Sequence, residues 1–196
     1  MAERSIEQEL GRAAQALRRA DRSFALVGGL AAAIRGEVRF TRDIDLAIDV
    51  TSDEEAERVV RDLCASGYEV VALVEHESAR RLSTARLRSR AGVRVDLLAA
   101  SSGIEHEIVH AAVPVEIERA GPIPVARAED LLATKVLSAS ERRPQDRADA
   151  IAILLAQPDI DLRRVREQLR RIRERGFHRD QDLDAKLDAL LEAARA

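Results

Sequence analysis

Two aspartates that could bind a metal together, Asp43 and Asp45, lie two residues apart in the segment 43–50, which reads DIDLAIDV. Apolar side chains alternate with them, and this period of two predicts a strand with both carboxylates on one face. Neighbouring carboxylates repel each other, and a divalent cation with oxygen ligands would offset that repulsion. The same pair is also typical of a solvated strand end, so its meaning depends on the residues around it.

A pair of glycines upstream, Gly28 and Gly29, predicts a phosphate-binding turn. The glycines follow the short apolar run 24–27, and the alanine-rich segment 30–35 after them has good helix propensity. This order predicts a strand, a glycine turn and the beginning of a helix. Glycines let the backbone approach a ligand closely, and the free N–H groups at the start of a helix favour a phosphate.

A third acid, Asp96, interrupts the apolar run 93–98, which predicts a buried strand. Burying a lone carboxylate costs on the order of several kcal/mol unless it is paired or bound to a metal. Asp96 therefore needs a partner. The candidates are a metal shared with Asp43 and Asp45, or a neighbouring arginine such as Arg86 or Arg94.

The glycine pair, the segment 39–45 (RFTRDID) and Asp96 together resemble the core of the DNA polymerase beta nucleotidyltransferase superfamily. Within it, residues 24 to about 155 are most similar to the AbiEii-type nucleotidyltransferase toxin family. Each motif alone is weak, but their order and spacing are fairly specific. The resemblance implies that the glycines hold a triphosphate, that the aspartate pair binds magnesium, and that Asp96 completes the metal site and helps to activate the attacking hydroxyl.

A lysine further along the chain, Lys135, is a candidate phosphate ligand. Only two of the 32 basic residues are lysine, and Lys135 lies among apolar residues of a predicted helix. A compact ammonium could be needed there for a phosphate, although composition alone allows chance. The family also has a lysine in this helix, and the resemblance adds Thr41 and Arg42 as further candidate contacts to the triphosphate. Toxin relatives often show serine where Thr41 stands.

An R-x-x-D-x-x-D segment after that helix is a further point of resemblance. It comprises Arg143, Asp146 and Asp149, and the two acids lie one helical turn apart. Asp146 is the acid that we expect to reach the active site. The alternative is that these acids cap the beginning of a helix, with Pro144 in its first turn.

One motif points to different chemistry. His106, Glu107 and His110 match H-E-x-x-H, the zinc peptidase motif, and Glu129 lies downstream as a candidate third ligand. However, Pro114 limits the segment to a short helix. So short a pattern often occurs by chance, and we do not assign it a function.

Arginines could contact RNA at two places. Arg86, Arg88 and Arg90 would share one face of a strand, and seven arginines line a predicted amphipathic helix over residues 161–175. Both groups are also typical of solvated faces, on an edge strand and on a surface helix respectively.

Bulk properties exclude several classes of protein. A length of 196 residues suits one domain, or a core with a helical appendage, and a net charge of -3 does not indicate a general nucleic-acid binder. The single cysteine, Cys64, cannot form an intramolecular disulfide. The N-terminus lacks the apolar core of a signal peptide, and no apolar stretch approaches a membrane span. We therefore expect a cytoplasmic protein without a membrane partner.

Periodicity and turn residues predict an α/β (α+β) fold. A small mixed sheet flanked by helices forms a nucleotidyltransferase core over residues 1–126, and a helical region follows over 127–196. We expect the sheet to be parallel in its first part and antiparallel later. The strands are predicted at 24–27, 43–50, 68–74, 82–88, 93–98, 113–117 and 123–125.

These observations predict a nucleotidyltransferase that uses two magnesium ions. The enzyme would join a nucleoside monophosphate from a nucleoside triphosphate to an acceptor hydroxyl. Resemblance to the toxin family implies an RNA acceptor such as a tRNA 3' end, and a cognate antitoxin protein. One alternative is an antibiotic nucleotidyltransferase of the aminoglycoside type, which would need an acidic pocket for a cationic drug. Another is a nucleotide-binding partner protein without catalysis.

Overall fold

The computed structural model describes residues 6–36, 41, 43–76 and 79–195. Its helices are α1 (Ile6–Arg19), α2 (Gly28–Arg35), α3 (Asp53–Ala65), α4 (Glu105–Ala111), α5 (Ala128–Ser138), α6 (Pro144–Ala156), α7 (Leu162–Glu174) and α8 (Leu183–Arg195). Its strands are β1 (Phe24–Val27), β2 (Asp43–Ile48), β3 (Glu69–His76), β4 (Arg81–Arg88), β5 (Arg94–Leu98), β6 (Val113–Ile117) and β7 (Gly121–Val125). The predicted α/β fold class is confirmed, and each predicted strand is present within a few residues of its expected ends.

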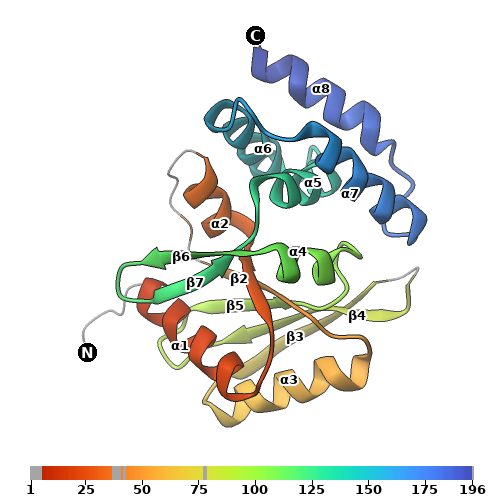
Figure 1. Cartoon of the computed structure of the whole chain (residues 1–196). Coiled ribbons are helices and arrows are strands. Elements are labelled where there is room, and N and C mark those ends of the chain that lie inside the picture. The colour runs from red at the N-terminus through yellow and green to blue at the C-terminus, as the bar shows by residue number, and fades with distance from the viewer. Residues whose placement is uncertain (1–5, 37–40, 42, 77–78, 196) are drawn as a thin grey trace.

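Within the described residues, the strands form one mixed sheet in the order β3-β4-β5-β2-β1-β7-β6. The predicted direction of its first part is wrong, because β1 and β2 pair antiparallel, whereas β2 pairs parallel with β5 and β1 with β7. The reason is the position of α2, which continues beyond the end of β1 and packs against α5 and α6 (Figure 1). The chain therefore re-enters the sheet at the end where it left, and a parallel pair would have needed a return crossover.

The alternation in β2 divides the sheet into two chemically different faces. Ile44, Leu46 and Ile48 are fully buried, and α1 and α3 pack beside each other below the sheet (Figure 1). Asp43 and Asp45 belong to the opposite set of side chains, on the face toward α4. Their position agrees with the period-two prediction and leaves the carboxylates free to line a cleft.

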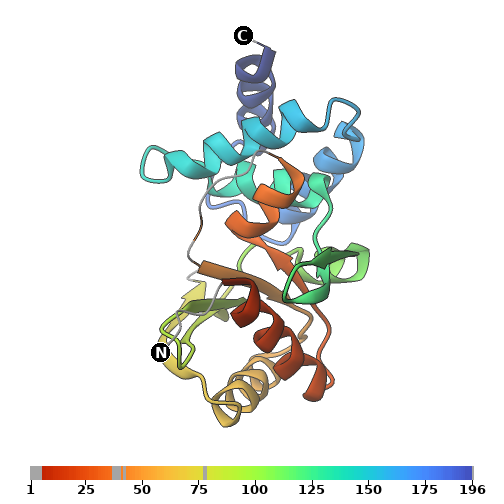
Figure 2. The same ribbon diagram turned by 90° about the vertical axis from the view of Figure 1, so that its left-hand side faces the viewer.

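The four helices from α5 to α8 gather beyond one end of the sheet, as the view in Figure 2 also shows. Helix α5 is central among them, because it packs against α6, α7, α8 and also α2. This position explains why α5 is buried on most of its sides, with Leu131, Leu132 and Val136 fully buried. None of the helices in the described residues is both long and apolar enough to cross a membrane.

One buried carboxylate ties α5 to α7. Asp130 is completely buried, and it accepts a hydrogen bond of 2.7 Å from Nε2 of Gln168 and a longer one of 3.4 Å from Nη2 of Arg164. Burial raises the pKa of Asp130, although the bonds from Gln168 and Arg164 oppose that effect.

We expect Asp130→Ala to lower the free energy of unfolding by about 1 to 3 kcal/mol, because it leaves the buried amide of Gln168 without its acceptor. Urea denaturation measures the change. Glu129→Ala is the matched control, since it removes a neighbouring, less buried acid from the same first helical turn and should cost only a few tenths of a kcal/mol. Equal losses in the two variants would show that the helix dipole, rather than the buried bond, stabilises this contact.

Candidate active site

A cleft of about 1000 Å³ lies where the glycine turn, the acidic strands and the helical region meet. The predicted site residues within the described part of the chain all line it, namely Gly28, Gly29, Thr41, Asp43, Asp45, Asp96, Lys135 and Asp146. Arg42, also predicted as a phosphate contact, lies outside the described residues. Segments more than 100 residues apart in the sequence thus form one cavity.

The three acids meet because β2 and β5 are neighbouring parallel strands. Asp45 is directly opposite Asp96 in the register, and Asp43 is opposite Arg94. Adjacent strands lie roughly 4.8 Å apart, so the carboxylates of Asp45 and Asp96 are neighbours on one face. The structure therefore places Asp43, Asp45 and Asp96 beside one another, as the sequence predicted.

The surroundings of Asp45 change its pKa. Burial, and then the negative charges of Asp96 and Asp43, raise its pKa to about 6, although Lys135 and a hydrogen bond from the Gly29 N–H oppose the rise. Burial is the largest cause of this shift, and the repulsion from the neighbouring acids adds to it, so a cation that enters the cleft would favour the ionised form of Asp45. This repulsion between neighbouring carboxylates is the feature of the cleft that agrees best with a site for a divalent metal.

Gly28 is required by the position of Asp45. Its φ angle of +66° lies in the left-handed region, and a Cβ atom there would overlap the Asp45 carboxylate. The structure places both glycines inside the first turn of α2 rather than before it. Both glycines line the cleft and α2 has no side-chain N-cap. Apart from the Gly29 N–H, which donates to Asp45, the first N–H groups of the helix therefore lack a side-chain cap at the place where a phosphate would bind.

Arginines pair with the acids, and both arginines that the sequence offered as partners of Asp96, Arg86 and Arg94, lie beside it. Arg86 donates to Asp96 through Nε at 3.1 Å and Nη2 at 3.1 Å, and Arg94 Nε lies 3.7 Å from the same carboxylate. Arg94 also bonds to Asp43. These guanidinium groups partly neutralise the acids while leaving them beside each other, so pairing with arginine does not exclude a metal site.

Lys135 is buried between the two acids of the R-x-x-D-x-x-D segment. Its Nζ lies 2.6 Å from Asp146 and 2.8 Å from Asp149, and Asp149 is almost completely buried. The positive charge of Lys135 also reaches Asp45, whose pKa it lowers. The acids therefore do more than begin α6, since they fix the ammonium at the cleft wall.

Arg179 is a cleft residue that sequence reasoning missed. It follows α7 with a left-handed φ of +55°, and its Nη2 donates to the backbone oxygen of Ser101 at 3.3 Å. Burial lowers its pKa, and so does the positive charge of Arg143, which also lines the cleft. No local pattern marks Arg179, because a long-range loop contact brings it to the site.

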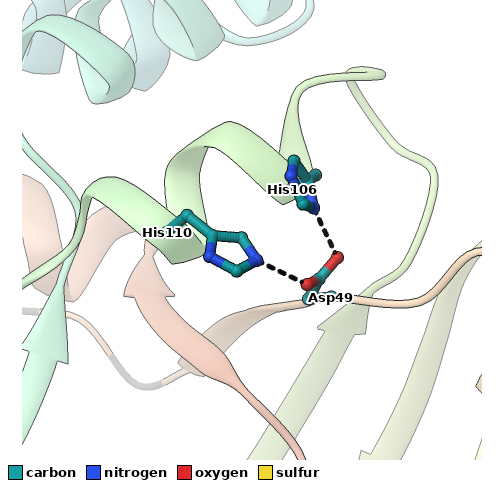
Figure 3. Close-up of side chains that lie close together, drawn as sticks. All are labelled: Asp49, His106 and His110. Atoms are coloured by element: carbon teal, nitrogen blue, oxygen red, sulfur yellow. Dashed lines mark hydrogen bonds and ion pairs between the residues drawn. The ribbon is translucent and has the colours of Figure 1, made fainter.

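The zinc peptidase alternative does not fit the structure. Glu107, which would be the catalytic base, instead pairs with Arg175 at 2.6 Å and Arg171 at 3.5 Å. His106 and His110 point to Asp49 rather than to Glu129 (Figure 3). Partial burial would raise the pKa of Asp49, but hydrogen bonds with His106 and His110 outweigh it and lower that pKa.

The predicted arginine row is formed only in part, because Arg86 and Arg88 lie two residues apart in β4 but Arg90 does not belong to the strand. Arg86 lies in β4 and points to Asp96 in the cleft, whereas Arg90 lies beyond the end of β4, near Gly67. β4 is also not an edge strand, because β3 covers it. Most arginines of the 161–175 segment pair with acids of this chain, including Asp130, Asp184 and Glu107. These ion pairs favour a role in holding the fold together over a role in RNA binding.

The mixed sheet, the glycine turn and the register of acids fit a nucleotidyltransferase, and a match to a family profile shows that the chain is one. The sequence profile of the family described as "Nucleotidyl transferase AbiEii toxin, Type IV TA system" matches residues 14–195, and the chain belongs to that family. The resemblance inferred from the motifs is therefore confirmed. A search of curated protein sequences finds no match.

Solved structures confirm the fold. An antigenic nucleotidyltransferase-like protein from Paracoccidioides brasiliensis is 19% identical with a TM-score of 0.53, over 93% of this chain and 92% of that one. The antibiotic-resistance factor ANT(2'')-Ia is 16% identical with a TM-score of 0.56, over 95% and 97%. A second structure of ANT(2'')-Ia, in complex with adenylyl-2''-tobramycin, has a TM-score of 0.52 at 14% identity, over 86% and 97%. At these identities the likeness concerns fold alone.

Gly28→Ala should destabilise the protein by about 2 to 4 kcal/mol, because it adds a left-handed alanine and an overlap with Asp45. Gly92→Ala provides the control, since Gly92 has a similar φ of +83° with open space around its missing side chain. Thermal and urea unfolding of both variants separates the backbone cost from the overlap. A loss no larger than that of Gly92→Ala would mean that Asp45 does not constrain this position.

Asp45→Asn should stabilise the metal-free protein by about 1 to 3 kcal/mol at pH 8. The folded-state pKa of Asp45, about 6, exceeds its ordinary value of 3.8, so between these values the folded protein binds more protons than the unfolded one. Stability contributed by the protonated acid is therefore lost as the pH rises from about 4 to 6. Urea denaturation in a chelator at pH 4 and pH 8 measures the difference between variant and parent. Exposed Asp159→Asn is the control, and a pH-independent difference for Asp45→Asn would contradict the prediction.

Proposed function

We propose that this protein is a magnesium-dependent enzyme of the cytoplasm that transfers a nucleoside monophosphate from a nucleoside triphosphate to a hydroxyl group of RNA, such as a tRNA 3' end. The observation that supports the proposal best is the convergence of the glycine turn, Lys135 and the three acids in one cleft. Phosphoryl transfer depends mainly on positioning and charge neutralisation, and these groups supply both.

The triphosphate lies, in this proposal, across the first turn of α2. Backbone N–H groups next to Gly28 and Gly29 bind phosphate oxygens, and the side chains of Thr41, Arg42 and Lys135 provide further donors. Asp146 holds Lys135 in place and so positions its ammonium group. A triphosphate competes with Asp146 for the ammonium, since both are anions.

We infer that Asp43, Asp45 and Asp96 hold two magnesium ions. Their three neighbouring carboxylates support this, and so do the charges of Asp96 and Asp43, which add to burial in raising the pKa of Asp45. When bound, the ions lower the pKa of the acceptor hydroxyl and neutralise the leaving pyrophosphate. The acceptor oxygen attacks the α-phosphorus, and the bond from that phosphorus to the bridging oxygen breaks. The hydroxyl proton passes to Asp96, and pyrophosphate leaves.

Arg143 and Arg179, which both line the cleft, support an anionic acceptor at this part of its wall, whereas Glu75 and Asp180 of the same lining are the groups that a cationic drug would contact. Arg143 and Arg179 lie close enough for one charge to lower the pKa of the other. Two neighbouring guanidinium groups attract a phosphate backbone and repel an aminoglycoside. Membership of a toxin family also implies a cognate antitoxin that counteracts the activity.

We expect the purified protein, incubated with Mg²⁺, total bacterial RNA and each labelled nucleoside triphosphate in turn, to transfer label from at least one of them to RNA. Asp43→Asn with Asp45→Asn should reduce labelling by at least about 100-fold, because the charges that hold the metals are gone. Asp159→Asn, which changes an exposed acid that does not line the cleft, should leave the rate unchanged.

A panel of aminoglycosides, assayed under the same conditions, tests the antibiotic alternative. Label in a drug and none in RNA would overturn the RNA proposal in favour of an antibiotic nucleotidyltransferase. No label in any acceptor, with nucleotide binding intact, would instead favour a nucleotide-binding partner protein without catalysis.

A further inference from the structure

Two histidines and one aspartate, all outside the cleft, converge on one point. His106 Nδ1 lies 3.0 Å from one oxygen of Asp49, and His110 Nε2 lies 2.8 Å from the other. Their ligand atoms all lie within 4.8 Å of one another, and the two rings are 4.3 Å apart between centroids. Figure 3 shows both rings directed from α4 to the same carboxylate.

The group is separate from the acidic centre of the cleft. Asp49 follows the end of β2, four residues after Asp45, which corresponds to roughly 13 Å along an extended chain. Neither Asp49 nor the two histidines line the cleft. The proposed phosphoryl transfer therefore makes no use of them.

The donor set is the kind that binds a transition metal. Two imidazole nitrogens and one carboxylate oxygen suit Zn²⁺ and related cations, whereas Mg²⁺ prefers oxygen ligands alone. With both histidines neutral the group has a net charge of about -1, so a divalent cation is attracted. Ion entry is open, since the side chains of His106 and His110 are 65% and 57% exposed.

The observed distances are close to those of a tetrahedral site. Bonds to zinc of about 2.0 to 2.1 Å place neighbouring ligand atoms roughly 3.3 Å apart. The two nitrogen-to-oxygen separations, 3.0 and 2.8 Å, require an opening of only a few tenths of an ångström. All ligand atoms of the group lie within 4.8 Å of one another, and the exposed imidazole rings can adjust by small rotations. The i, i+4 spacing already places both histidines on one side of α4.

We propose that Asp49, His106 and His110 bind a divalent transition-metal cation, for which Zn²⁺ is the probe, with water as the fourth ligand. The site is structural rather than hydrolytic, because Glu107, the base of the motif, is held by Arg175 on the other side. The cation joins the end of β2 to α4. Glu105 of the same helix accepts from the N–H groups of Ser101 and Ser102, two residues that line the cleft.

The test is a Zn²⁺ titration of the full chain without an affinity tag, monitored by competition with a chromogenic chelator in excess Mg²⁺. We expect one Zn²⁺ per chain, and a loss of affinity of about 100-fold in His106→Ala and in Asp49→Asn, because each removes one of three ligands. Co²⁺ should give the visible absorption of a tetrahedral site in the parent protein and not in His106→Ala or Asp49→Asn. His76→Ala and His178→Ala, which change the other two histidines of the chain, should bind as the parent does.

A variant of the acidic centre distinguishes the two metal sites. Asp43→Asn with Asp45→Asn should retain Zn²⁺ binding, so the result does not depend on the proposed reaction. Circular dichroism without metal shows that each variant is folded, and the exposure of His106 makes its replacement the least disruptive one. Equal Zn²⁺ affinity in His106→Ala and the parent, or loss of binding only in the Asp43 and Asp45 variant, would overturn the proposal.

Discussion

Like charges held beside each other are the constraint on which the rest of this structure depends. The parallel pairing of β2 with β5 places Asp45 opposite Asp96, and the pKa of Asp45 rises to about 6 as a result of burial and of this neighbouring charge. Such an arrangement costs free energy in the absence of a ligand. The apolar side chains on the other face of β2 hold the acids there, because a slip of one residue would turn the acids into the apolar core.

Positive groups around the acids reduce that cost without removing it. Arg86 and Arg94 pair with Asp96 and Asp43 from the sheet, and Lys135 acts on Asp45 from α5. Each cation comes from a different element, so the charge balance of the cleft requires that the sheet and the helical region remain packed together. Helix α2 connects the two parts, since it begins beside Asp45 and packs against both α5 and α6.

Local patterns in the sequence predict much of this architecture but not its long-range geometry. Alternation identified β2 and its two acids, and the order of motifs identified the family. The predicted direction of β1 relative to β2 was wrong, because this direction depends on where α2 packs and not on the residues of either strand. Arg179 was missed for the same reason, since its loop reaches the cleft through a bond to Ser101. The boundary near residue 127 stays a prediction.

The motif in α4 shows most clearly where local reasoning ends. Spacing alone places His106 and His110 on one side of a helix in any fold. Which carboxylate meets them is decided by tertiary structure, and here it is Asp49 from the end of β2 rather than Glu107 from the motif itself. Glu107 is instead committed to Arg175 and Arg171, which connect α4 to α7. The same five residues that would form a catalytic centre in a peptidase therefore serve, in this chain, to join α4 to the sheet on one side and to the helical region on the other.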